Sequence, residues 1–148
     1  MFRSGRRWFT CGAISLILIA ILHGLGHFAT PEHDAKEMAV ISAMQDHKME
    51  MGLGMNPSLW DAFQGLSLTM CVTMLALGLQ SLAVAHGDES GRLVRQYSVL
   101  NVVALGCLVA VYLFHRLSVP LVAISVAEIL FVLSLVSCAR KSPSTGAS

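Results

Sequence analysis

The chain has 148 residues, of which 55% are hydrophobic and 13% are charged, and its formal net charge is +1. This composition is too apolar for a water-soluble domain of this length, and it indicates a membrane protein. The small net charge, without a cluster of lysine and arginine, argues against a partner nucleic acid. The four cysteines fall one in each apolar segment and form no C-x-x-C pair, so they predict neither a disulfide framework nor a thiolate metal site.

Four apolar segments are each long enough to cross a lipid bilayer, because about 20 mostly apolar residues span its hydrocarbon core. We place these spanning segments at residues 8–29, 58–85, 94–115 and 119–139. The run GDESG and Pro120 mark the turns after the second and third segments. We therefore predict an all-α fold: an integral membrane four-helix bundle, a single membrane domain over residues 1–148.

The first segment has two interpretations, because basic residues before an apolar run also precede a cleaved signal peptide. The residues at its end, GHFA at positions 26–29, do not form an A-x-A-like cleavage site. The segment is also long enough to span a membrane. We therefore expect an uncleaved helix, which keeps its histidines in the mature protein.

Positive charges near the spanning segments predict the orientation of the chain, since lysine and arginine favour the cytoplasmic side. They gather before the first segment, in the second turn and after the fourth segment: Arg3, Arg6, Arg7, Arg92, Arg95, Arg140 and Lys141. Arg116 is alone in the third link. Both termini are therefore predicted to be cytoplasmic, and the loop at residues 30–57 extracytoplasmic, although it carries Lys36 and Lys48.

The loop after the first segment predicts an extracytoplasmic amphipathic helix over residues 31–51. Thr30 and Pro31, followed by acidic residues, are typical of a helix start. Apolar residues and one histidine then recur at helical spacing: Val40, Ile41, Met44, His47 and Met51. Gly52 and Gly54 are expected to end this helix.

The same loop is rich in methionine and also suggests a Cu(I) site, because thioether and imidazole suit a soft metal. The candidate ligands are Met38, Met44, Met49, Met51, Met55, His33 and His47. The competing interpretation is that methionine fills irregular gaps on helix faces. The five methionines are spread around the predicted helix, which favours the second interpretation.

Ionisable and aromatic polar residues in spanning segments are costly, so each one is a functional hypothesis. At helical rise, those of this chain fall in the outer half of the membrane or near its middle: His23, His27, Asp61, Tyr112, His115 and Glu128. His23, His27, Asp61, His115 and Glu128 offer the imidazole and carboxylate ligands of a metal site. His23, His27, Tyr112 and His115 could instead hold a haem or a quinone-like small amphiphile.

Each of these residues also has a structural interpretation. Ser58 and Asp61 form the S-x-x-D pattern of a capping box. His27 and His115 lie close to the interface, and His23 is at a depth where a hydrogen bond to a neighbouring helix is expected. Glu128 lies near the midplane and must be neutral or paired, with His23 the nearest cation by depth.

Small residues in the spanning segments are expected to let helices approach closely: Gly12, Gly24, Gly26, Gly65, Gly78 and Gly106. The sequence contains no G-x-S-x-G, no H-E-x-x-H and no nucleotide-binding loop, so it leaves open whether the protein is an enzyme. The alternative to ligand binding is a structural or assembly subunit, which meets a membrane-protein partner or a second copy and has no ligand of its own.

Three motifs in the first half of the chain carry a resemblance: HGxGHF, AMxxHxxxMG and SxWDxFxGxS. Together they resemble an uncharacterised family of small bacterial four-helix membrane proteins. The resemblance implies the four-helix fold and a bacterial inner membrane. It also implies that one recurring pattern joins His23, Gly26, His27, Trp60, Asp61, Phe63 and Gly65. No activity is attached to this family, so the resemblance leaves the function and any cofactor open.

Overall fold

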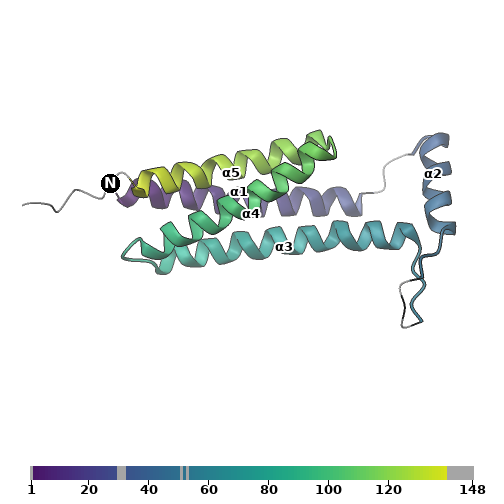
Figure 1. Ribbon diagram of the computed structural model, residues 1–148, viewed down its shortest axis with the longest axis horizontal. Coiled ribbons are helices and arrows are strands. Elements are labelled where there is room, and N and C mark those ends of the chain that lie inside the picture. The colour runs from purple at the N-terminus through teal and green to yellow at the C-terminus, as the bar shows by residue number, and fades with distance from the viewer. Residues whose placement is uncertain (1, 30–32, 51, 53, 140–148) are drawn as a thin grey trace, which may run out of the picture. The chain divides into compact units, whose positions relative to one another are not determined.

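The computed structural model describes residues 2–29, 33–50, 52 and 54–139. It has five helices, α1 (Phe2–Phe28), α2 (Ala35–Asp46), α3 (Leu59–Gly87), α4 (Arg92–Phe114) and α5 (Ser118–Ala139) (Figure 1). Four of them, α1, α3, α4 and α5, are long and apolar enough to cross a membrane. The described residues contain no strand, only an isolated bridge between Lys48 and Ser58. The predicted all-α fold with four spanning helices is confirmed.

The helix bounds follow the apolar segments closely, with one difference. The predicted bounds of α3, α4 and α5 lie within two residues of the observed ones at each end. By contrast, α1 begins at Phe2, six residues before its predicted start. Arginine is a good helix former, so the polar residues before the apolar run continue the same helix.

The chain forms two compact units, residues 1–19 with 74–148 and residues 20–73. We call these the first unit and the second unit. The first unit contains the N-terminal part of α1, the C-terminal part of α3, and all of α4 and α5. The second unit contains the end of α1, α2 and the beginning of α3.

Helix contacts in the first unit close a ring of four helices. The rings of Phe9 on α1 and Phe131 on α5 meet edge to face with centroids 5.3 Å apart. The hydroxyls of Ser98 on α4 and Ser134 on α5 are 3.0 Å apart. On the other side, the Asn101 amide of α4 donates to the Ser81 hydroxyl of α3 at 3.1 Å. Gly78 on α3 lies against the backbone of Ala13 and Ile17 on α1, which completes the ring.

The buried serines between α4, α5 and α1 have hydrogen-bond partners inside the first unit, as a low-dielectric interior requires. Ser134 donates to the Gly5 carbonyl at 2.9 Å, which joins α5 to α1. Ser98 Oγ on α4 lies 2.7 Å from the Val94 carbonyl and 3.0 Å from Ser134 Oγ, and its single proton goes to one of these two oxygens. Because each hydroxyl has a partner, this polar seam stabilises helix packing and leaves no open donor for a ligand.

The glycines of the spanning helices differ in their surroundings. A Cβ at Gly78 on α3 would lie 2.6 Å from Ile17 Cγ1 and 3.0 Å from the Ala13 carbonyl oxygen on α1. A Cβ at Gly12 would lie 3.0 Å from the Phe131 ring. Around Gly26 and Gly65, in contrast, no described atom lies within 4 Å of the added carbon. The prediction of close helix approach is confirmed for Gly12 and Gly78 and is wrong for Gly26 and Gly65.

The link between α3 and α4 is organised by a buried aspartate, Asp88, which is 3% exposed. Its Oδ1 accepts from the Gly91 amide at 2.9 Å, and its Oδ2 accepts from the Val94 amide at 2.8 Å. Gly91, the N-cap residue, has φ 77° and no side chain, so Asp88 caps α4 from three residues earlier. Burial raises the pKa of Asp88, but these hydrogen bonds together bring that pKa below its usual value.

The end of α4 is a Schellman motif with an unusual residue in it. The Leu117 amide donates to the Tyr112 carbonyl at 3.0 Å, and the Arg116 amide donates to the Leu113 carbonyl at 3.2 Å. Arg116 has φ 55°, a left-handed conformation that glycine normally adopts at this position. The motif reverses the chain within a few residues, and α5 begins at Ser118.

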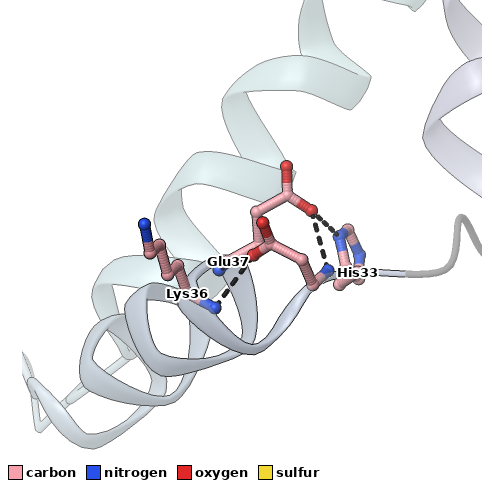
Figure 2. A network of polar contacts seen from close by, with 4 residues as sticks. His33, Lys36 and Glu37 are labelled. Atoms are coloured by element: carbon pink, nitrogen blue, oxygen red, sulfur yellow. Dashed lines mark hydrogen bonds and ion pairs between the residues drawn. The ribbon is translucent and has the colours of Figure 1, made fainter.

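In the second unit, α2 begins four residues later than predicted, and Asp34 is its N-cap. The Asp34 carboxylate accepts from the Lys36 and Glu37 amides at 2.8 and 2.7 Å, and the Glu37 carboxylate accepts from the Asp34 amide at 3.3 Å (Figure 2). Glu37 also contacts His33 Nδ1 at 3.3 Å. The predicted start at Thr30 and Pro31 lies outside the described residues. The capping box moves the start of the helix to Ala35 because it satisfies the first amides there.

The end of α2 is also earlier than predicted, at Asp46 rather than at Met51. The Leu59 amide donates to the His47 carbonyl, and the Met49 amide donates to the Pro57 carbonyl, both at 2.9 Å. These two bonds hold the segment after α2 against the segment before α3. They bring one face of α2 to the aromatic start of α3. An open groove results, lined by His33, Lys36, Glu37, Val40, Ile41, Met44, Trp60 and Phe63.

Candidate functional site

Two histidines of α1 and a serine of α3 meet in the second unit: His23, His27 and Ser67. His23 Nε2 lies 3.0 Å from Ser67 Oγ, and His27 Nδ1 lies 3.3 Å from the same oxygen. We call these three residues the His–Ser–His cluster. A hydroxyl has one proton and two lone pairs, so Ser67 can donate to at most one of the two imidazoles and accepts from at least one. The cluster therefore contains at least one imidazole N–H donor beside a hydroxyl that can both donate and accept.

Helical geometry explains why these side chains meet. His23 and His27 are four residues apart on α1, so both project from one face of that helix. Ser67 lies eight residues after the start of α3, about 12 Å along its axis at the helical rise. His27 is one residue and His23 five residues before the end of α1. The cluster is thus inside the spanning part of both helices, toward the ends that face the α2 loop.

All three side chains are half-buried, so they are held by packing but still accessible from one side. Gly24 lies between the two histidines, and a Cβ at this glycine would meet Cys71 Sγ at 3.8 Å, an ordinary contact distance. The small residue thus keeps α1 near α3 at the level of the cluster.

An aromatic pair lies on the same face of α3 as Ser67. The rings of Trp60 and Phe63 stack with centroids 5.9 Å apart and an interplanar angle of 28°. Positions 60, 63 and 67 follow helical spacing, so the pair and the hydroxyl form one stripe. Phe63 is 54% exposed, which leaves apolar ring surface open beside the polar cluster.

Asp61, predicted as a metal ligand or as a cap, has the geometry of a cap. Its amide donates to Ser58 Oγ at 3.0 Å, while the Ser58 amide and hydroxyl donate to Asp61 Oδ2 at 2.9 and 2.7 Å. The predicted capping box is confirmed. Asp61 Oδ2 is therefore engaged with the first turn of α3.

The remaining predicted site residues, Tyr112, His115 and Glu128, belong to the first unit. Tyr112 is buried, at 8% exposed. His115 is exposed at the end of α4, and its ring packs edge-on against Phe114 with centroids 5.1 Å apart. Glu128 is half-buried, with Oε1 3.1 Å from the position of a Cβ on Gly106. Whether these three residues share a pocket with the histidines of the second unit stays a prediction.

Metal-binding capacity was predicted for five residues, and the structure brings two of them together, His23 and His27. The part of the chain that is described contains no group of three or more His, Cys, Asp or Glu side chains that could hold a metal ion. Of the methionines proposed for copper, Met44 lines the groove, whereas Met38 and Met55 are exposed. Met51 lies outside the described residues.

Ser67 was not among the predicted site residues. It is the last residue of the SxWDxFxGxS motif, and it lies seven residues after Trp60 on the same helix face. This seven-residue spacing was the signal in the sequence that could have placed Ser67 beside the aromatic residues of the motif. Serine in a spanning helix usually bonds to its own backbone, so nothing in the sequence marks this hydroxyl as a partner for α1.

Comparison with protein-family models, with curated proteins and with solved structures found no match to this chain.

Proposed function

We propose that this multi-pass membrane protein binds a small amphiphile, such as a quinone, whose polar head is held by the His–Ser–His cluster. The observation that carries the proposal is the convergence of two imidazole nitrogens on Ser67 Oγ, at 3.0 and 3.3 Å. A group that offers both a donor and an acceptor suits the carbonyl or hydroxyl of such a head group.

The chemistry of the cluster allows a ligand to enter it. Both bonds of the Ser67 hydroxyl go to side chains, and the longer one, to His27, is the weaker by distance. A ligand carbonyl can therefore accept a hydrogen bond from an imidazole N–H in exchange for that bond. Ser67 would keep its shorter contact with His23, at 3.0 Å, so its hydroxyl would not be left without a partner.

The aromatic stripe supplies the apolar part of the proposed site. Trp60 and Phe63 are stacked and lie on the Ser67 face of α3, toward the start of the helix. Flat rings next to a polar pair suit a ligand that has a planar or alkyl body attached to a polar head. Aromatic rings exposed on the side of a spanning helix also face the lipid, from which an amphiphile can diffuse into the site.

Two rival functions use the same residues differently. A d-block metal ion or a haem would be bound by the imidazoles, and its binding would displace the Ser67 hydroxyl from at least one of them. An assembly subunit would use the cluster only to hold α1 to α3, and would bind a membrane-protein partner or a second copy elsewhere. The rivals differ in what copurifies with the chain.

Protein purified in mild detergent should carry an amphiphile that organic solvent extracts and mass spectrometry identifies, in constant proportion to the chain. Ser67→Ala should reduce that proportion because the hydroxyl that orients both imidazoles is lost. Thr69→Val is the matched control: Thr69 is on the same helix and is exposed, and its hydroxyl donates to the Gly65 carbonyl of its own turn. Visible absorption or bound metal in the purified protein would instead support the metal or haem function.

We further propose that the chain lies in a bacterial inner membrane with both termini in the cytoplasm. Support comes from the gathering of basic residues at one end of the first unit. Arg6 donates to the His86 carbonyl at 3.4 Å, which joins the start of α1 to the end of α3. Arg92 and Arg95 begin α4 next to that link. This end therefore carries the charge excess that favours the cytoplasmic side.

Cysteine labelling in intact cells tests this orientation. In a chain whose four native cysteines are replaced by alanine, Asp46→Cys should react with an impermeant thiol reagent, because α2 is extracytoplasmic in the proposal. Ser90→Cys, in the α3–α4 link, should react only after the membrane is permeabilised. The reverse pattern would invert the topology.

A further inference from the structure

We propose that the groove between α2 and the start of α3 binds one zwitterionic phospholipid of the phosphatidylethanolamine type. The lipid phosphate contacts Lys36, its ammonium contacts Glu37, and an acyl chain lies against Trp60 and Phe63. The head-group residues of this site are on α2. The site shares only its aromatic pair with the proposed amphiphile site, and it does not rest on that proposal.

The groove lies where a spanning helix begins. α3 starts at Leu59 and is long and apolar enough to cross a membrane. Trp60 and Phe63, in its first two turns, therefore lie at the depth of the lipid head groups, where aromatic side chains are enriched. The bond from the Leu59 amide to the His47 carbonyl, at 2.9 Å, holds the end of α2 beside this start. The groove is thus open to lipid at head-group level.

The walls of the groove are apolar, and the protein leaves them partly uncovered. Apolar side chains of α2 and α3 line it: Val40, Ile41, Met44, Trp60 and Phe63. Val40 is 60% exposed and Phe63 is 54% exposed, so a lipid chain that covers them removes apolar surface from water. The groove has a volume of about 440 Å³, within the range of about 300–1,000 Å³ of small-molecule sites. This size suits a head group and the first part of an acyl chain.

Charged side chains line the same groove beside the first turn of α2 (Figure 2). Lys36 supplies an ammonium group and Glu37 a carboxylate, and both residues are exposed. Glu37 Oε2 accepts from the Asp34 amide and contacts His33 Nδ1, both at 3.3 Å, which is long for a charge-assisted bond. The other oxygen, Oε1, has no hydrogen bond to any described residue. It can therefore accept from the ammonium of a ligand.

The two opposite charges favour a zwitterionic head group. Phosphatidylethanolamine carries a phosphate and a primary ammonium two carbons apart, which match a cation and an anion on neighbouring residues of α2. An anionic lipid would bring uncompensated negative charge beside Glu37, and a choline lipid has no N–H to donate to it. Because exposed ion pairs contribute little energy, apolar contact supplies most of the affinity. Lys36 and Glu37 then decide which head group binds.

Titration of the protein in detergent micelles with phosphatidylethanolamine that has brominated acyl chains tests this site. Bromine quenches nearby tryptophan fluorescence, so Trp60 reports occupancy of the groove in a Trp8→Phe background. The quenching should be saturable, and phosphatidylcholine with the same chains should bind about fivefold more weakly. Lys36→Gln should raise the dissociation constant for phosphatidylethanolamine about fivefold. Lys48→Gln, the same change at an exposed lysine outside the groove, should leave it unchanged.

Glu37→Gln separates head-group binding from the structure of α2. Glutamine at the third position of a capping box still accepts from the N-cap amide, so the helix keeps its start while the charge is lost. This variant should lose the preference for phosphatidylethanolamine over phosphatidylcholine. Glu50→Gln, at an exposed acid outside the groove, should retain that preference.

Three outcomes would overturn the inference: equal binding of the two lipids by wild type, tighter binding of the anionic phosphatidylglycerol, or no saturable quenching by any lipid. Ser67→Ala should bind phosphatidylethanolamine as wild type does, because the serine contacts the histidines and not the groove. A failure of this site and a failure of the proposed amphiphile binding are therefore distinguishable.

Discussion

Replacing Asp88 by alanine is expected to destabilise the protein by about 3 kcal/mol, since it removes a helix cap and strands buried amides. The Asp88 carboxylate accepts from Ser90 N and Oγ at 3.1 and 2.9 Å, as well as from Gly91 and Val94. Gly91 has no side chain that could replace it. Reversible unfolding in mixed detergent micelles measures the decrease in the free energy of unfolding. Glu89→Ala, in the same turn but exposed, should change the free energy of unfolding by less than about 0.5 kcal/mol.

The same aspartate predicts a pH dependence. The pKa of Asp88 is lowered in the folded state from its ordinary 3.8, because the hydrogen bonds that favour the carboxylate outweigh the burial that raises it. The stabilisation that ionised Asp88 contributes to the folded state is therefore complete above pH 3.8, its pKa in the unfolded chain. It is lost as the pH falls through the lower pKa of the folded state. The difference in stability between wild type and Asp88→Asn should stay constant from neutral pH to about pH 5 and shrink below pH 4. A difference that grows on acidification would contradict the assigned hydrogen bonds.

Replacing Gly78 by alanine is expected to cost about 2 kcal/mol. The added carbon would lie 3.0 Å from the Ala13 carbonyl oxygen and 3.2 Å from the Ile17 amide nitrogen. These are backbone atoms of α1, so the conflict is relieved only if one helix moves away from the other. The loosened helix pair should lower the free energy of unfolding in detergent.

Gly65→Ala is the matched control for Gly78→Ala, because it makes the same substitution on the same helix. Around Gly65 no described atom lies within 4 Å of the added carbon. Alanine has the higher helix propensity, so this variant should be neutral or more stable by up to about 1 kcal/mol. Equal losses at the two positions would show that the cost is one of helix conformation and not of α1–α3 contact.

Most of the fold could be predicted from the sequence because apolar length decides which segments span a membrane. The bounds of α3, α4 and α5 followed from that rule. The start of α1 did not, because this helix includes arginines that precede the apolar segment. In the loop, we predicted a helix start at Thr30-Pro31, whereas α2 starts after the capping box formed by Asp34 and Glu37. The capping box fixes the start there because the Asp34 side chain accepts from the Glu37 amide and the Glu37 side chain accepts from the Asp34 amide.

The candidate site was less predictable, because it depends on which helices meet. The pair His23 and His27 could be found from its spacing, and the Ser58–Asp61 cap from its pattern. Ser67 could not, since a serine in a spanning helix usually satisfies itself. The different roles of Gly65 and Gly78 also depend on the crossing of α1 and α3, which hydropathy does not encode.

The central claim, that the His–Ser–His cluster holds the polar head of an amphiphile, is tested most directly by equilibrium titration with a short-chain benzoquinone. Quenching of the fluorescence of Trp60, in a Trp8→Phe background, reports binding beside the cluster. Loss of one hydrogen bond predicts a dissociation constant about tenfold higher in Ser67→Ala, and Thr69→Val should bind as wild type does. Equal dissociation constants for wild type and Ser67→Ala, or no saturable quenching in wild type, would contradict the claim.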